Sequence, residues 1–442
     1  MKKLALRDLI LLGMTNFALY VGAGNIIFPP YIGMLSGEGV TIAAIGFLLT
    51  GVGLPVIAAI ALAKVGGVLG QITEPIGVKV GVFMTILCYL AIGPFYAIPR
   101  TATVAYELAI TPFYIEETGD NAGNNSMLLI YTLIYFVIAV TFALYPAKIL
   151  DTVGKFLSPV KIFALVILCV TALFLAPSAP IEGLEPFKSQ PFSQGIINGY
   201  LTLDTLASLA FGTVIVDAIR SRGVNDEKAI TKYATISGLI AGSGLTFIYV
   251  CLFKLGNESY GIAPNASNGA EILSAYVHYA FGPLGNIFLA MLIIVACLVT
   301  AIGLICACSA YFHKISGIGY RKFAFAIAIV SCGLSNLGLT QLINVSVPIL
   351  IAVYPAFVVL VLASFFKKHF VNSIRVIAPT ATLATLFGIV DGFDAAGIEL
   401  LPKVITNFLP LYSSDLAWLL PCAILFFIMI IIDKTLSKAK VA

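Results

Sequence analysis

Apolar segments of about twenty residues recur along the whole chain, and this recurrence limits the possible folds more than any other feature. Of the 442 residues, 60% are hydrophobic and only 10% are charged. A soluble globular domain is about half apolar and about a quarter charged. Backbone groups that face lipid must be hydrogen-bonded within their own helix. The sequence therefore predicts an all-α membrane protein that forms one integral membrane domain.

Hydropathy predicts about twelve membrane-spanning helices. The opening MKKLALRDLILLGM is expected to belong to the first helix and not to a cleaved signal peptide, because its apolar run continues without interruption. The expected spans are 8–35, 39–63, 78–106, 127–146, 156–176, 194–219, 229–253, 284–312, 323–337, 341–366, 373–391 and 413–432.

Basic residues gather on one side of this arrangement. If the N-terminus lies inside, the cytoplasmic connections hold almost every lysine and arginine, with Lys161 among them. The exceptions are Arg100, Lys188, Lys254 and Lys403. The positive-inside rule then predicts that both termini are cytoplasmic. The opposite connections are rich in acidic residues, which we interpret as solvated loops; a cation-attracting vestibule is the alternative.

The first span is interrupted by the stretch YVGAGNIIFPP at 20–30. Gly22 and Gly24 weaken a helix, and Pro29 and Pro30 remove amide donors. Unpaired backbone at membrane depth is tolerated only where it is buried in protein or lines a cavity. We therefore expect this helix to be unwound in the middle of the membrane. A kinked helix with glycines for close packing is the competing interpretation.

A second interrupted span, TLDTLASLAFGTVIVDAI at 202–219, is the sixth in order and carries polar residues ahead of Gly212. Five spans per repeat would invert a second copy relative to the first, and breaks at matching positions of inverted halves mark the central site of a transporter. We therefore predict a 5+5 inverted repeat with helices 1 and 6 unwound. The first repeat is expected at 1–176, the second at 177–366, and two further spans at 367–442.

The ends of broken helices offer complementary binding chemistry. The N-terminus of a half-helix presents free N–H groups and a positive dipole end, which attract an anion, while a C-terminus presents carbonyls for a cation. The first break contains no acidic side chain, although a substrate that is only an amine or a metal ion would favour one. A zwitterion with its own carboxylate needs none. The pattern favours an amino acid as substrate.

Three motifs, LILLGMTNFALYVGAGNIIFPP, AIGPFYAIPRTATVAYE and YLTLDTLASLAFG, resemble the BrnQ-type family of branched-chain amino acid symporters, also called LIVCS. The resemblance covers essentially the whole chain, and it implies the LeuT-type inverted-repeat fold. It also implies import of leucine, isoleucine and valine by alternating access across a bacterial plasma (inner) membrane. Sodium is the implied coupling ion, and protons serve in some members.

The resemblance also implies roles for individual residues. The substrate carboxylate would bind Gly22, Ala23 and Gly24. The amine and side chain of the substrate would lie against an unwound SLAFG stretch, at Ala207, Ser208 and Phe211. The implied ligands of a first sodium ion are Asn25 and the Tyr20 carbonyl, and those of a second are the Ala18, Val21 and Ala296 carbonyls and the Thr300 hydroxyl. Val299 stands where many relatives carry a further hydroxyl, which weakens the second site.

Asp204 is the one carboxylate expected deep inside a span, and such a group is a functional candidate by default. It could bind sodium, carry a proton or pair with a basic group, and capping of the broken helix is the structural alternative. Thr205, next to it, joins the candidates for ion coupling.

Arg100 is the one basic residue assigned to the interior of a span, and we expect a structural or gating role, with Glu107 as a possible partner. Phe95 and Tyr96 are candidate aromatic lids over the site, although simple packing is the better expectation for either ring.

Other classes of protein find less support. The three histidines, 278, 313 and 369, lack metal or triad spacing, and no nucleotide-binding loop is present, so an enzyme is not expected. The eight cysteines are interpreted as small buried hydrophobes. A channel would predict charged rings or carbonyl filters around a pore. A proton-coupled carrier that uses Asp204 remains open. The expected partners are the amino acid and the lipid bilayer, with no nucleic acid; the oligomeric state is left open.

Overall fold

The computed structural model describes residues 4–113, 124–145, 158–402, 406 and 408–439. These residues form helices and no β-strand. The helices are α1 (Leu6–Tyr20), α2 (Ala23–Ser36), α3 (Val40–Leu48), α4 (Leu54–Lys64), α5 (Leu69–Thr73), α6 (Val78–Leu90), α7 (Ala97–Ala109), α9 (Asn124–Ala143), α11 (Ser158–Phe174), α12 (Pro191–Tyr200), α13 (Asp204–Ser221), α14 (Glu227–Asn257), α15 (Gly269–Ser316), α16 (Tyr320–Ser335), α17 (Leu339–Ser364), α18 (Ser373–Ala395) and α20 (Leu419–Ala439).

Each predicted span overlaps one of these helices or a pair of them, although α15 begins at Gly269 and not at 284, and α20 begins at Leu419 and not at 413. Nine helical segments in the described ranges are long and apolar enough to cross a membrane, and Lys161–Phe174 is a shorter apolar helix. Large apolar side chains such as Phe174, Leu284 and Phe427 are exposed on the outside of the bundle. Exposed apolar surface on this scale is typical of helices that face lipid. Lys403 lies outside the described residues.

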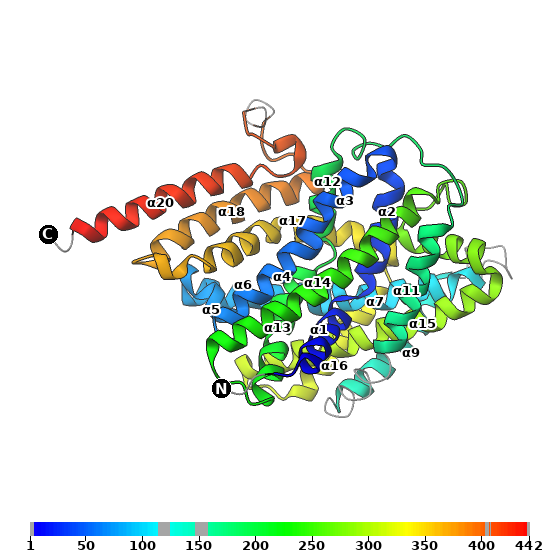
Figure 1. The fold of residues 1–442 in the computed structure, drawn as a ribbon, viewed down its shortest axis with the longest axis horizontal. Helices are drawn as coiled ribbons and strands as arrows, with labels where there is room; N and C mark the ends of the chain where they lie inside the picture. Colours follow the sequence, from blue (N-terminus) through cyan, green and yellow to red (C-terminus); the bar gives the residue numbers. More distant parts are fainter. Residues whose placement is uncertain (1–3, 114–123, 146–157, 403–405, 407, 440–442) are drawn as a thin grey trace.

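The helices are arranged around a central group (Figure 1). Helix α14 packs against α1, α2 and α4, helix α15 packs against α2 and α7, and helix α13 packs against α1, α4 and α14. Helices α17, α18 and α20 lie together at one end of the bundle, and α9 and α11 lie on the opposite side. Both broken helices therefore belong to the interior of the protein.

Glycines allow the central helices to approach closely. A Cβ atom built on Gly46 of α3 would collide with the carbonyl oxygen of Phe192, and one on Gly195 of α12 would collide with that of Ala43. The two helices thus pack backbone to backbone, which is the usual role of small residues between membrane helices.

Both predicted breaks are present. The first separates α1 from α2 at Val21 and Gly22, where the backbone is extended. The second separates α12 from α13 at 201–203. The prediction that SLAFG is unwound is wrong, because Ser208 and Phe211 lie within the regular helix α13. The interruption falls one turn earlier, where Leu203 adopts a left-handed conformation with φ of 69°.

Candidate functional site

The first break is shaped by a local hydrogen bond. The Gly22 N–H donates to Asn25 Oδ1 at 2.8 Å instead of to the Ala18 carbonyl, its partner in a continuous helix. Helix α1 therefore ends with free carbonyl oxygens, whereas α2 begins at Ala23 with free N–H groups. One interruption thus presents a negative and a positive dipole end within a few residues of each other.

Asp204 joins the second break to the first. Its Oδ2 accepts hydrogen bonds from Asn25 Nδ2 and from the Tyr249 hydroxyl, each at 2.7 Å. Asn25 Nδ2 also donates to the Tyr249 oxygen. All three side chains are at least 98% buried. One carboxylate oxygen therefore connects the second break to the first and to α14.

Arg100 fills the space between the two breaks. Its guanidinium donates to the carbonyl oxygens of Leu201 at 2.6 Å and Thr202 at 3.0 Å, both in the second break. A Cβ atom built on Gly24 would lie only 2.5 Å from Nη2, so the same group lies directly against the start of α2. Arg100 is 3% exposed, and its Nε has no hydrogen-bond partner among the described residues. The guanidinium thus brings a positive charge to the N-terminus of α2.

Aromatic rings hold the guanidinium in place. Its central carbon lies 4.7 Å from the ring centroid of Tyr96 and 5.5 Å from that of Phe28, within the range of cation–π attraction. The Tyr96 hydroxyl also accepts a hydrogen bond from Nη1 at 3.2 Å. The predicted pairing of Arg100 with Glu107 is wrong, because its partners are carbonyl oxygens and Tyr96. Phe95 is 51% exposed and lies outside this site, so the structure does not support a lid at that residue.

Lys161 of α11 lies at the end of α1. Its ammonium donates to the Val21 carbonyl oxygen and, at 3.5 Å, to that of Ala18. The residue is 5% exposed. The charge pattern assigns Lys161 to a cytoplasmic connection, and this assignment is wrong, because the side chain points into the bundle. The ammonium contacts two of the carbonyls that the resemblance assigns to a second sodium ion.

A small cavity lies between the two breaks. It has a volume of about 30 Å³ and is lined by Tyr20, Gly22, Ala23, Asn25, Arg100, Asp204, Ala207, Phe211 and Thr300, among others. The structure therefore brings together predicted substrate and sodium residues from the first, third, sixth and eighth spans. The volume suffices for about two water molecules. An amino acid fits only if the walls move apart.

The hydroxyls of two predicted site residues bond within their own helices, and a third residue, Thr205, does not line the small cavity. The Ser208 hydroxyl donates to the Asp204 carbonyl at 2.7 Å, and the Thr300 hydroxyl donates to the Ala296 carbonyl at 3.0 Å. Thr205 is fully buried in α13 beside Asp204. Thr300 nevertheless faces the first break, because its methyl group lies 3.6 Å from a Cβ atom built on Gly22.

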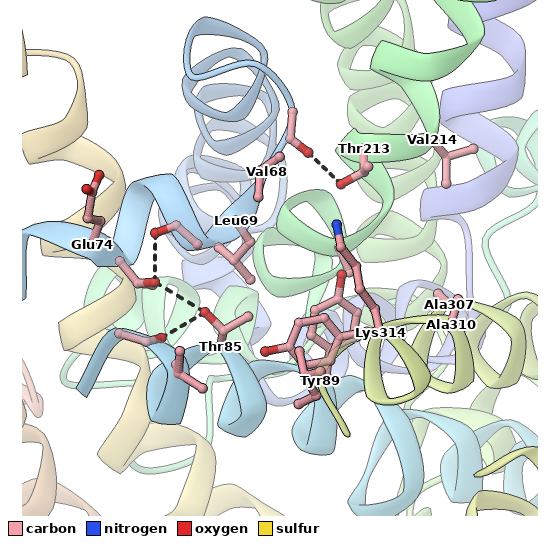
Figure 2. A pocket seen from close by; sticks show the side chains of 18 of the residues that line it. Val68, Leu69, Glu74, Thr85, Tyr89, Thr213, Val214, Ala307, Ala310 and Lys314 are labelled. Carbon is pink, nitrogen blue, oxygen red and sulfur yellow. Dashed lines mark hydrogen bonds between the residues drawn. The ribbon is translucent and has the colours of Figure 1, made fainter. Parts of the chain in front are cut away.

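A larger cavity of about 570 Å³ begins one turn further along α13 (Figure 2). Ala207 and Phe211 line the small cavity, whereas Ala210, Thr213 and Val214 line the large one. The rings of Tyr89 and Tyr311, stacked with centroids 4.0 Å apart, form part of its wall. Glu74 and Lys314 also line it.

Two residues of the site escape prediction from the sequence. Tyr249 lies in a helix with no motif around it, so no signal was available. Lys161 carries a signal, since it is the only charged residue in the apolar helix 158–174. A charge at that depth is a functional candidate by default.

Two broken helices that meet around buried charges, inside an apolar bundle, define a membrane transporter of the LeuT fold class. Solved structures agree with this fold. The chain is similar to Mhp1, a nucleobase-cation-symport-1 family transporter, solved in a closed conformation with bromovinylhydantoin bound. The TM-score is 0.61 and the identity 13%, over 98% of this chain and 93% of Mhp1. It is also similar to MhsT in complex with L-phenylalanine, with a TM-score of 0.56, 15% identity, and coverage of 97% and 98%.

The chain belongs to the family described as "Branched-chain amino acid transport protein", which it matches over residues 5–436. It is 50% identical to the branched-chain amino acid transport system 3 carrier protein of Pseudomonas aeruginosa, over 99% of this chain and 98% of the relative. It is 48% identical to the branched-chain amino acid permease BrnQ of Escherichia coli, over 98% and 97%. It is 42% identical to the permease BraB of Bacillus subtilis, over 95% and 94%. These relatives are permeases, and the chain is a multi-pass membrane transporter and not an enzyme.

Proposed function

We propose that this protein imports leucine, isoleucine and valine together with sodium, by alternating access between the two sides of a bacterial plasma membrane. The observation that carries the proposal is the direct hydrogen bond between the two helix breaks, from Asn25 to Asp204, beside a guanidinium. This centre holds a guanidinium that can bind the carboxylate of a zwitterionic substrate, and backbone carbonyl oxygens that can bind its ammonium.

The substrate carboxylate is proposed to bind at the start of α2. The N–H groups of Ala23 and Gly24 belong to the first turn of that helix, where intrahelical partners are lacking. Arg100 lies against Gly24 and adds a full charge to the dipole. Arg100 now donates to two carbonyl oxygens, and it would donate to the bound carboxylate instead. The substrate ammonium can then donate to those carbonyl oxygens.

The sodium ion is proposed to bind next to the substrate, at Asn25 Oδ1, the Tyr20 carbonyl and the Asp204 carboxylate. These groups supply the oxygen ligands that hard cations prefer. Asp204 accepts hydrogen bonds from two donors, and in its ionised form it would supply an anionic ligand to the ion. Proton coupling through Asp204 is the alternative, and it would require this carboxylate to exchange those partners during the cycle.

The substrate side chain is proposed to lie against the apolar wall formed by Ile92, Ala207, Phe211 and Leu304. Leucine, isoleucine and valine differ by a methylene or a branch point. Such a difference is worth roughly 1–3 kcal/mol in an apolar pocket. One site is therefore expected to accept all three amino acids.

The exit path is proposed to lead through the larger cavity along α13. That cavity is next to the small one, and Lys314, which the charge pattern places on the cytoplasmic side, lines it. An inward-facing opening there, with both termini cytoplasmic, fits alternating access around a fixed central site.

Purified protein in liposomes tests the proposal. Uptake of labelled leucine should follow an inward sodium gradient at equal pH on both sides, and unlabelled isoleucine and valine should compete while lysine and glutamate should not. Uptake that follows a pH gradient without sodium would favour the proton alternative. Absence of leucine uptake under both gradients would contradict the proposed import.

A further inference from the structure

We infer that the ammonium of Lys161 serves as a built-in cation at the end of α1, in place of a second sodium ion. The inference rests on the proposed sodium-coupled import and specifies its ion stoichiometry: one sodium ion is bound per transport cycle.

The end of α1 presents buried carbonyl oxygens. Helix α1 ends at Tyr20, and the Gly22 N–H that would bond to the Ala18 carbonyl is taken by Asn25 Oδ1. The Ala18 oxygen thus lacks its helical donor, and the Val21 oxygen lies with it at the negative end of the α1 dipole, within reach of Lys161. Buried carbonyl oxygens need a donor or a cation.

Lys161 lies directly against these oxygens. Lys161 reaches these two oxygens from α11, a helix remote in sequence and otherwise apolar. The described residues contain no carboxylate in an ion pair with it. Within the described ranges, its hydrogen bonds go to backbone carbonyl oxygens, which are also the groups that coordinate a bound alkali cation.

The facing oxygens of α15, those of Thr300 and Ala296, already bond to each other. Thr300 directs its hydroxyl to the Ala296 carbonyl, so these two groups satisfy each other within α15. Of the four groups that the resemblance assigns to a second sodium ion, two are bonded to Lys161 and two to each other. A second sodium ion would have to displace a tethered charge of the same sign.

The ammonium of Lys161 thus ties α11 to the broken end of α1 through two carbonyl oxygens.

The experiment measures sodium-driven leucine uptake in liposomes as a function of sodium concentration. Wild type should show a Hill coefficient of about 1 for sodium. Lys161→Met keeps an unbranched side chain one atom shorter and removes the charge and the donors. It should lower uptake about tenfold or more, because two buried oxygens lose their partner. Lys254→Met is the matched control, because Lys254 pairs with Glu258 directly after its own helix, and uptake by this variant should stay within about twofold of wild type.

Lys161→Ala opens space for an external cation. Uptake by this variant should be restored in part by high sodium, with a steeper sodium dependence than wild type, or by n-propylammonium, which replaces the deleted atoms. The melting temperature of the purified variant should rise with either cation, whereas that of wild type should not respond to n-propylammonium. This second readout does not depend on transport, so it decides the inference even if the proposed import fails.

A wild-type Hill coefficient of about 2 would overturn the inference. So would wild-type activity in Lys161→Met, or a failure of both cations to restore uptake and raise the melting temperature of Lys161→Ala. Absence of sodium-driven uptake in wild type, together with a cation-dependent melting temperature of Lys161→Ala, would contradict the proposed function and support the tethered cation.

Discussion

Gly24→Ala is the substitution that most sharply tests the arrangement of the two breaks. The added Cβ atom would lie 2.5 Å from Arg100 Nη2, whereas ordinary van der Waals contact begins at 3.4 Å, so the guanidinium must retreat by about 0.9 Å. We expect this displacement to lengthen the hydrogen bond to the Thr202 carbonyl, now 3.0 Å, beyond hydrogen-bond range. A hydrogen bond to a charged group is worth about 1.5–3 kcal/mol. Leucine uptake should therefore fall by about tenfold to a hundredfold.

The fold should survive this change, because alanine favours a helix over glycine by about 0.5–1 kcal/mol. The assay is initial uptake of labelled leucine by cells that express each variant, normalised to the amount of protein in the membrane. Gly303→Ala is the control, since a Cβ atom there meets no other atom within 4 Å. Leucine transport by Gly24→Ala at the rate of the control would contradict a functional contact between Gly24 and the Arg100 guanidinium.

Further substitutions test other parts of the site. Asp204→Asn should abolish sodium-stimulated uptake, measured at saturating leucine, because the carboxylate that joins the breaks is lost; persistence of sodium stimulation would count against the proposed ion site. Tyr249→Phe removes one hydrogen bond to Asp204 and should raise the sodium concentration for half-maximal uptake about fivefold. Ser208→Ala should change uptake by less than about twofold, since its hydroxyl bonds within α13 and lies outside the cavity wall; a larger loss would restore Ser208 as a substrate ligand. Gly195→Val should lower the melting temperature through a collision with the Ala43 carbonyl, worth about 1–3 kcal/mol; an unchanged melting temperature would contradict the close packing of α3 and α12.

The first break could be predicted from the sequence because it is written in residues with strong local preferences. Gly22 and Gly24 interrupt an apolar run, and the following Asn25 supplies a side chain that can take over a backbone N–H. The position of the second break could not be predicted to the residue. Its turning point is Leu203, which carries no glycine or proline signal and is held in a left-handed conformation by its surroundings.

The partners of the buried charges depend on the tertiary fold. Asp204 stands out in the sequence, but its donors lie 179 and 45 residues away along the chain. Arg100 also stands out, yet no sequence pattern shows that it reaches two carbonyls of the sixth span rather than a nearby acid. The charge pattern predicts a cytoplasmic position for Lys161, since a lysine near a span end ordinarily extends to the interface. Only the packing of α11 on the end of α1 turns that side chain inward.

The most direct test of the central claim is a structure determined with leucine and sodium bound. The account predicts that the leucine carboxylate lies within hydrogen-bonding distance of the Ala23 and Gly24 N–H groups and the Arg100 guanidinium, with the leucine side chain against Phe211. Leucine bound only in the larger cavity beside Tyr89, with the space between the two breaks closed as it is here, would contradict it.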